Sequence, residues 1–360
     1  MKKQSPSKKP SGRDLEKISF DYIAGRLGKF LEDQNLMGQT LPLGFSFSFP
    51  CKQEAIDKCF LIRWTKDFSC SGVEGKDVVE LLKEAIHKRG DFNIGQVAVV
   101  NDTVSTMLSC SYQDPNCEIG LIIGTGTNAC YMEEVKNVEH VEGEEGRMCI
   151  NTEWGGFGDD GSLKDIQTEC DKMVDEKSDS PGVHIFEKMI SGLYLGEIVR
   201  LVLIKLTEKN LLFKGQTSTE LEKKNSFKTE FISAIEQLNK GLENTKKILT
   251  DLKLEFQMVD VHVVRLVCKT VSTRSAHLCA AATAAVAERI RENRGLDQLK
   301  IMVGVDGTVY KKHPNFSTEF QEKLSILAPK CDFTFLDSDG SSGTGAAKAV
   351  AVDQRLQSGR

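Results

Sequence analysis

Residues 96–110 read QVAVVNDTVSTMLSC, and residues 118–130 read EIGLIIGTGTNAC. Each segment contains an apolar, β-branched run, at 97–100 in the first and at 119–123 in the second. Short runs of this kind, bounded by turn-forming residues, are typical of buried strands in an α/β fold. We therefore predict two buried strands here, each of which ends abruptly in small polar residues.

The first of these strands ends in Asn101-Asp102-Thr103, which places a carboxylate directly after a buried run. In open α/β sheets, ligands bind at the carboxyl ends of the strands. A carboxylate at such an edge can accept the proton of a substrate hydroxyl as that hydroxyl attacks a phosphoryl group. Asp102 is therefore a candidate catalytic base, and the alternative interpretation is a helix N-cap or turn residue.

The second strand ends in Gly124-Thr125-Gly126, where backbone N–H groups can approach an anion without interference from a Cβ atom. This turn matches neither the GxxxxGK[ST] loop nor a GxGxxG motif that opens a helix, and a tight hairpin is the alternative. Asp306-Gly307-Thr308 repeats the pattern, and residues 339–345 (DGSSGTG) precede a predicted helix whose N-terminus favours an anion. Three glycine turns together indicate a nucleotide-phosphate site.

Four planar polar side chains fall at predicted strand ends: Asn101, Asp102, Asn128 and Glu153. A ligand with many hydroxyl groups needs several fixed donors and acceptors of this kind, whereas loop capping is the alternative use for them. Lys66 could hydrogen-bond the same ligand or be a solvated surface lysine.

Charge and cysteine usage exclude several classes of protein. Residues 1–13 carry five positive charges and no acid, so the remaining residues carry a net charge of −10, which argues against nucleic-acid binding. The eleven cysteines show no CxxC pair and no zinc-type spacing, which indicates a reduced, cytoplasmic protein without a protein-held metal site. No apolar run approaches the roughly 18 residues that a membrane span needs.

The periodicity of the rest of the chain predicts an α/β protein with two domains of similar plan, the first incomplete. We expect a disordered basic tail at 1–13, a small domain at 14–101, a large domain at 102–344, and a final helix at 345–360 that packs back on the small domain. Predicted helices fall at 14–34, 77–88, 184–206 (as two), 228–239, 242–252, 261–271, 275–291, 316–327 and 346–356. Further predicted strands fall at 41–49, 60–64, 147–151, 300–305 and 333–336.

Eight segments in order closely resemble the animal hexokinases, from about Leu15 to the C-terminus. They are LPLGFSFSFPC (41–51), IRWTKDF (62–68), VAVVNDTVSTM (97–107), IGLIIGTGTNACYMEE (119–134), NTEWGGFGDDG (151–161), ISGLYLGEIVR (190–200), VGVDGTVYKKHPNF (303–316) and DGSSGTGAA (339–347). The resemblance implies two ribonuclease-H-like domains around a cleft, as in one catalytic half of such an enzyme. It also implies transfer of the ATP γ-phosphate to the 6-hydroxyl of a glucose-like hexose, the first step of glycolysis, with Mg²⁺ bound mainly through the nucleotide.

The same resemblance implies roles for individual residues. Asp102 matches the catalytic base. The residues that match sugar contacts are Ser48, Phe49, Pro50, Thr65, Lys66, Asn101, Asn128, Glu153 and Gln216. The residues that match nucleotide contacts are Gly124, Thr125, Gly126, a loop formed by Ser272, Thr273, Arg274 and Ser275, then Asp306, Gly307, Thr308, and the turn Gly340, Ser341, Ser342, Gly343, Thr344.

The sequence departs from the family pattern at four places. An Asp-Leu-Gly-Gly-Thr-Asn phosphate motif, expected with three strands before the first helix, is absent. Thr219 stands where the family has a sugar-contacting glutamate, Lys223-Lys224-Asn225 stands for Thr-Arg-Gly, and the last turn has an extra serine and Thr344 in place of a basic residue. An impaired sugar-binding or regulatory relative is therefore the alternative function, and a partner domain or second hexokinase half could complete the molecule. Association with the mitochondrial outer surface is a further alternative, although no anchor is seen.

Overall fold

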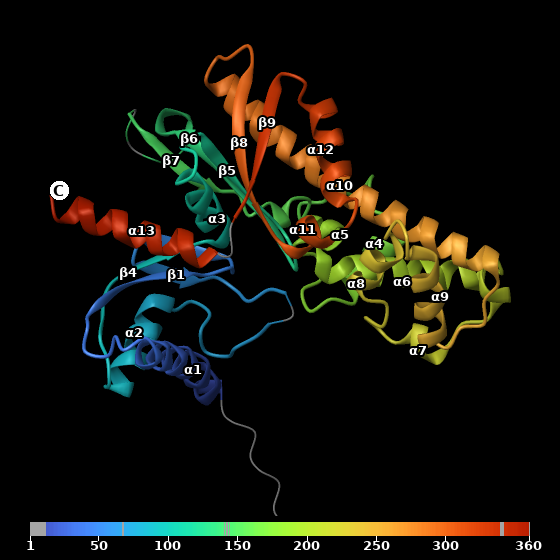
Figure 1. Cartoon of the computed structure of the whole chain (residues 1–360), viewed down its shortest axis with the longest axis horizontal. Helices are drawn as coiled ribbons and strands as arrows, with labels where there is room; N and C mark the ends of the chain where they lie inside the picture. The colour runs from blue at the N-terminus through green and yellow to red at the C-terminus, as the bar shows by residue number, and fades with distance from the viewer. Residues whose placement is uncertain are drawn as a thin grey trace, which may run out of the picture. The chain divides into compact units, whose positions relative to one another are not determined.

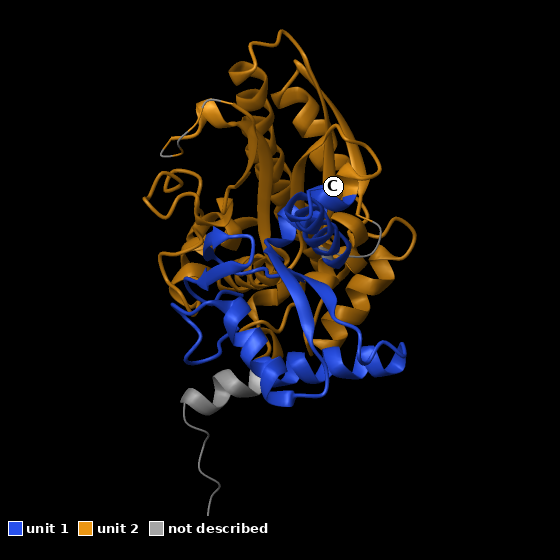
Figure 2. Cartoon of the chain, turned by 90° about the vertical axis from the view of Figure 1, so that its left-hand side faces the viewer, with its two compact units in different colours: residues 1–109, 339–360 blue, residues 110–338 orange. Residues whose placement is uncertain are grey.

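The computed structural model describes residues 12–66, 68–139, 141, 143, 145–338 and 342–359. Apart from residues 12 and 13, which open the first helix, the tail predicted at 1–13 lies outside this range. The chain divides into two compact units, unit 1 with residues 1–109 and 339–360, and unit 2 with residues 110–338 (Figure 2). These limits differ from the predicted 14–101 and 102–344, because residues 102–109 and 339–344 group with the small unit.

Unit 1 is built around a short parallel sheet of β1 (Leu41–Ser46) and β4 (Ile94–Val100), in which Leu43 pairs with Val97 and Ser46 with Val100. Helix α13 (Ser342–Gln357) packs against both strands, and α1 (Gly12–Asp33) packs on α2 (Val78–Arg89). Asp77 caps α2 by accepting a hydrogen bond from the Val79 N–H, and Gly90 ends the helix in the left-handed conformation.

The segment after β1 differs from the prediction of strands at 41–49 and 60–64. The first strand ends at Ser46, and a hairpin of β2 (Cys51–Ala55) and β3 (Lys58–Leu61) follows. Helix α3 (Asp102–Ser111), which is not among the predicted helices, comes directly after β4. Its Val104 and Leu108 pack with Ala98, Val100 and Ala346, which explains why α3 groups with unit 1.

Unit 2 contains a five-stranded sheet in the order β7-β6-β5-β8-β9. The strands are β5 (Cys117–Ile123), β6 (Thr127–Glu134), β7 (Arg147–Asn151), β8 (Leu299–Asp306) and β9 (Cys331–Asp337). The β5–β8 and β8–β9 pairs are parallel, whereas β5–β6 and β6–β7 are antiparallel. The ends of β5 and β8 therefore lie at the same edge, with Ile122 opposite Asp306.

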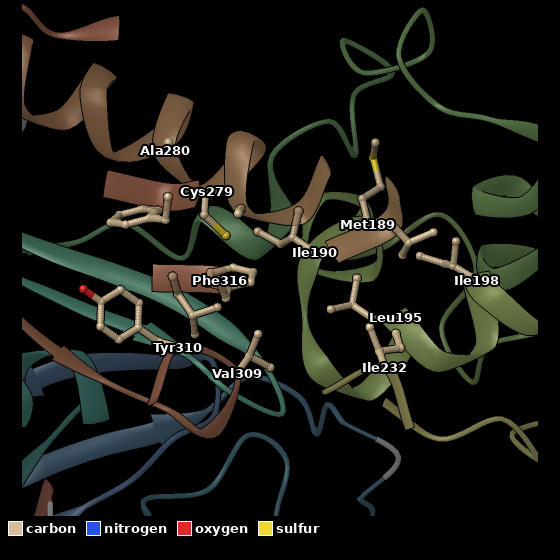
Figure 3. Packing of buried hydrophobic residues seen from close by; sticks show 14 of the residues in the cluster. Met189, Ile190, Leu195, Ile198, Ile232, Cys279, Ala280, Val309, Tyr310 and Phe316 are labelled. Carbon is tan, nitrogen blue, oxygen red and sulfur yellow. The ribbon is translucent and has the colours of Figure 1, made fainter. Parts of the chain in front are cut away.

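The helices of unit 2 supply most of its core. They are α4 (Glu169–Glu176), α5 (Ile185–Ile190), α6 (Gly192–Glu208), α7 (Thr219–Glu222), α8 (Thr229–Ile235), α9 (Gly241–Asp251), α10 (Met258–Asn293), α11 (Thr308–Lys312) and α12 (Phe316–Leu327), with 3₁₀ turns at Val135–Asn137, Trp154–Gly156 and Phe213–Gly215. Helices α10 and α12 pack on each other beside β8 and β9 (Figure 1). In the interior, Leu195 of α6 and Ile232 of α8 lie next to each other (Figure 3).

The prediction of two helices at 261–271 and 275–291, separated by a loop, was wrong. Helix α10 is continuous for 36 residues. The stretch between the predicted helices contains hydroxyl side chains but no glycine or proline, and the Ser272 hydroxyl donates back to the Lys269 carbonyl within the helix. Among the described residues, no helix combines the length and apolarity that a bilayer crossing requires.

Candidate functional site

In unit 1, Asp102 lies where β4 gives way to α3. It is the first residue of the helix, and its Oδ1 accepts a hydrogen bond of 2.9 Å from the Thr103 N–H. Asn101 caps the same end, since its Oδ1 accepts from the Thr103 N–H at 2.9 Å and from the Thr103 hydroxyl at 2.6 Å. A carboxylate at this position has the chemistry of a proton acceptor.

Two loops of unit 1 bring other predicted sugar contacts together. Lys66 Nζ donates to the Ser48 carbonyl at 2.8 Å and lies 5.7 Å from the centre of the Phe49 ring. The Ile62 N–H donates to the Pro50 carbonyl at 2.9 Å, which ties the two loops at a second point. Lys66 has a φ of +63°, an uncommon conformation for a residue other than glycine, and it is fixed there by these contacts.

In unit 2, Asn128 and Glu153 belong to one hydrogen-bond network with Asn151. Asn128 Nδ2 donates to Asn151 Oδ1 at 2.7 Å and to Glu153 Oε1 at 3.1 Å, and Asn151 Nδ2 donates to the same Glu153 oxygen at 2.8 Å. Glu153 has a φ of +48°, so its backbone is also in the left-handed region. Sequence reasoning missed Asn151, although its place at the last position of a predicted strand, two residues before Glu153, was a usable signal.

The turn Gly124-Thr125-Gly126 joins β5 to β6 and closes on itself through a hydrogen bond from the Gly124 N–H to the Gly126 carbonyl. The first residues of α6 bond to the turn: the Gly192 N–H donates to the Gly124 carbonyl and the Leu193 N–H donates to the Thr125 carbonyl. The buried Glu187 carboxylate accepts from the Thr127 N–H at 2.9 Å. Hydrogen bonds from neighbouring segments therefore fix the backbone of this turn.

Glycines from three elements meet beneath this turn. A Cβ atom on Gly307, whose φ is +112°, would lie 2.3 Å from the Ile123 carbonyl oxygen. A Cβ atom on Gly192 would lie 2.8 Å from the Gly124 oxygen, and one on Gly124 would lie 3.3 Å from the Gly307 Cα. Backbone can pack this closely only where no side chain intervenes.

Asp306 is the last residue of β8, at the same edge of the sheet, and its side chain bonds to the backbone of Gly307. Its Oδ1 accepts from the Gly307 N–H at 2.7 Å and from Lys311 Nζ at 2.9 Å. Burial acts to raise the pKa of the Asp306 carboxyl, but the hydrogen bonds from Lys311 and Gly307 outweigh it and hold this pKa below its ordinary value. Asp306 is therefore an anion at neutral pH whose charge is largely neutralised by Lys311.

A cavity of about 550 Å³ opens beside these glycines within unit 2. Its polar wall includes Thr125, Lys228, Thr229, Thr308, Lys312 and His313. Hydroxyl groups and ammonium groups are donors that suit phosphate oxygens, while Leu193, Phe227 and Val309 supply an apolar part. The cavity volume lies in the range of small-molecule and cofactor sites.

Several predicted site residues are not brought to this cavity. In α10, Ser272 donates to Glu236, Arg274 donates to both Asp171 carboxylate oxygens at 2.7 Å, and Ser275 donates to the Ile190 carbonyl. Neither they nor Thr273 line the cavity. Ser272 is linked to the cavity wall only through Glu236, a carboxylate oxygen of which lies 3.3 Å from Nε2 of the wall residue His313.

The remaining predicted contacts are placed as follows. Gln216 is exposed, and none of the hydrogen bonds described for unit 2 joins its side chain to Asn128 or Glu153. Ser342, Gly343 and Thr344 form the first turn of α13 in unit 1 rather than a loop before a helix that starts at 346. Gly340 and Ser341 lie outside the described residues.

Metal-binding side chains do not gather in the part of the chain that the structure describes. No group of three or more histidine, cysteine, aspartate and glutamate side chains there could hold a metal ion. None of the eleven cysteines is joined in a disulfide.

Comparison with known proteins gives a consistent family. Two family models described as hexokinase match residues 4–112 and 118–352. Hexokinase-2 of Homo sapiens is 55% identical over 338 residues, and hexokinase-1 of Homo sapiens is 54% identical over 337 residues. Each alignment covers 94% of this chain but 37% of the relative, so the chain spans little more than a third of these relatives.

Two solved structures share the fold. A hexokinase from Schistosoma mansoni complexed with glucose superimposes with a TM-score of 0.87 and 38% identity, over 97% of this chain and 79% of that chain. Another hexokinase crystal structure superimposes with a TM-score of 0.74 and 29% identity, over 93% of this chain and 74% of that chain. These matches confirm the resemblance and the fold class that the eight sequence segments predict. The chain belongs to the hexokinase family.

Proposed function

We propose that the chain catalyses ATP-dependent phosphorylation of a glucose-like hexose at the 6-hydroxyl. The observation that carries this proposal is the position of Asp102. Its carboxylate lies at the end of β4 and the start of α3, in a chain whose fold superimposes on a hexokinase complexed with glucose. That is the place where a strand can present a base to a bound substrate.

In this reaction Asp102 accepts the proton of the sugar 6-hydroxyl while the hydroxyl oxygen bonds to the γ-phosphorus of ATP. The bond from this phosphorus to the bridging oxygen breaks, and its electron pair leaves with ADP. An ordinary carboxylate is a weak base, so its contribution is chiefly to orient the hydroxyl and take the proton late in the transfer.

Each unit contains candidate sugar contacts. In unit 1, Ser48, Phe49, Pro50, Thr65, Lys66 and Asn101 would contact the sugar, with Lys66 held in place by the Ser48 carbonyl. In unit 2, Asn128 and Glu153 would contact its hydroxyls, with Asn151 fixing both side chains. Gln216 is a further candidate from an exposed segment.

The cavity beside Gly124, Gly192 and Gly307 is the proposed nucleotide site. Threonine hydroxyls and the ammonium groups of Lys228 and Lys312 would bind the phosphates. Ser342, Gly343 and Thr344 of unit 1 remain candidate nucleotide contacts by the family resemblance alone. Mg²⁺ would arrive with the nucleotide and neutralise charge on the phosphates. The eleven cysteines, none joined in a disulfide, support a cytoplasmic location, and the greater length of the relatives supports a partner domain or second hexokinase half.

A coupled assay of glucose-dependent ADP release by the purified chain tests the proposal. We expect turnover that falls by about 10²–10⁴-fold in Asp102→Asn, the range of a positioned general base. Thermal stabilisation by glucose should be kept in this variant, which shows that the sugar still binds. Stabilisation by glucose without any turnover in the unmodified chain would contradict the proposed activity.

A further inference from the structure

A buried ion pair lies behind one wall of the cavity in unit 2. Glu197 and Arg200 are one turn apart on α6, and their side chains are 5% and 4% exposed. Arg200 Nε donates to Glu197 Oε2 at 2.7 Å, and Arg200 Nη2 donates to Glu197 Oε1 at 2.6 Å. This two-point geometry is the strongest form of the contact between these residue types.

The pair also makes hydrogen bonds to the backbone of residues 221–225. Arg200 Nη1 donates to the Leu221 carbonyl at 2.9 Å and to the Glu222 carbonyl at 3.1 Å. Glu197 Oε2 accepts from the Asn225 N–H at 2.8 Å. The pair therefore fixes residues 221–225, the end of α7 and the turn that follows it, at three backbone atoms.

Asn225 is the residue that this clamp delivers to the cavity. It lines the cavity wall, as Glu197 does, and its φ of +61° places it in the left-handed region. A residue other than glycine stays in this conformation only when its surroundings impose it, and asparagine tolerates it better than most. The hydrogen bond from its N–H to Glu197 is part of that constraint.

We propose that Glu197 and Arg200 are positioning residues for nucleotide binding, acting through residues 221–225. The inference rests on the proposed function of the cavity as the nucleotide site. Because Arg200 neutralises Glu197, the wall can hold a carboxylate beside an anionic ligand without repelling it. The pair thus serves two needs at once: it fixes residues 221–225, and it neutralises the charge that Glu197 alone would place in the wall.

Glu197→Gln distinguishes the positioning effect of the pair from its effect on charge. If the carboxylate mattered only through its charge, its removal would leave Arg200 unopposed and tighten the binding of an anionic nucleotide. If the pair positions residues 221–225, loss of the two-point contact loosens them and weakens binding. We expect the dissociation constant for a magnesium-loaded, non-hydrolysable ATP analogue, measured by calorimetry, to rise about tenfold, the loss of one charge-assisted hydrogen bond. Glucose affinity should stay within twofold.

Glu288→Gln is the matched control. Glu288 and Arg291 form the same type of pair on α10, with Arg291 Nε 2.7 Å from Glu288 Oε2, and neither lines the cavity. This variant should bind the analogue as the unmodified chain does. A second variant, Glu197→Met combined with Arg200→Met, removes both charges at similar volume, so it should fold even if the single variant does not. It should bind the analogue at least tenfold more weakly while keeping its glucose affinity.

The outcomes are distinct. If the unmodified chain fails to bind the analogue, the nucleotide assignment of the cavity is wrong, and the inference fails with it. If the unmodified chain binds and Glu197→Gln binds equally or more tightly, the positioning role alone is overturned. Equal binding by the double variant overturns it as well, including the case in which the single variant does not fold.

Discussion

Gly307→Ala tests whether close backbone packing against Ile123 and Gly124 stabilises the glycine turn of unit 2. Gly307 has a φ of +112° and a ψ of 144°, a combination open essentially to glycine alone, and alanine there costs about 1–3 kcal/mol. The new Cβ atom would also lie 2.3 Å from the Ile123 oxygen and 2.8 Å from the Gly124 nitrogen. Both are backbone atoms, so the overlap adds about 1–3 kcal/mol of overpacking strain. The expected loss is about 2–6 kcal/mol, a large part of a typical domain stability of about 5–15 kcal/mol.

Gly295→Ala is the control for this prediction. Gly295 has a φ of +62°, but an added Cβ atom meets nothing within 4 Å, so only the conformational cost of about 1–2 kcal/mol applies. Unfolding can be followed separately in unit 2, because the chain has two tryptophans and Trp154 is the one in that unit. In a Trp64→Phe background, urea titration of Trp154 fluorescence should show the larger loss for Gly307→Ala. Equal losses for the two glycines would refute the packing argument.

Three further predictions concern individual side chains. Asn151→Ala should raise the KM for glucose about tenfold with kcat less affected, because the hydrogen bond from Asn128 to Asn151 is lost. Steady-state kinetics test this prediction, and an unchanged KM would contradict it. Lys66→Met should also raise the KM for glucose about tenfold, and an equal effect on the KM for ATP would argue against a sugar-specific role. Glu236→Gln should cost about 1–3 kcal/mol at pH 7, since the ionised carboxylate is bonded within a buried cluster that includes His313. Burial acts to raise the Glu236 pKa, but the hydrogen bonds that Glu236 receives from His313 and from its other partners lower this pKa below the ordinary 4.5. The stabilisation by the ionised carboxylate is therefore present above pH 4.5 and is lost as the pH falls toward the lowered value. Urea titrations at several pH values should therefore show the difference between the two proteins shrinking below pH 4.5, and a difference that persists or grows there would contradict the prediction.

Much of the fold could be predicted from local sequence signals. The strands at 97–100 and 119–123 were readable because buried strands in an α/β sheet are continuously apolar, and the Asp77 and Gly90 caps mark α2 by their residue types. The break between α5 and α6 was readable from Gly192. Asp102 and the glycine turns were found for the same reason, since each follows directly on a buried strand.

The errors share a physical cause, which is that tertiary contacts outweigh weak local preferences. Hydroxyl residues at 272–275 look like a loop in isolation, but neighbouring helices accept their hydrogen bonds and α10 runs through. Helix α3 is short and rich in serine and threonine, and it is stabilised by packing on β4 and α13 rather than by propensity. Asn151 had a local signal in its place at a strand end, whereas the contacts of Glu197 and Arg200 with residues 221–225 join segments far apart in the sequence, which no local pattern reveals.

The central claim is that this chain moves a phosphoryl group from ATP to the 6-hydroxyl of a hexose. The most direct measurement is ³¹P NMR of the purified chain with ATP, Mg²⁺ and glucose, with 6-deoxyglucose in a parallel sample. The account predicts a phosphate-monoester signal that grows with ADP in the glucose sample and is absent with 6-deoxyglucose. No monoester from glucose, under conditions in which the chain binds both glucose and ATP, would contradict it.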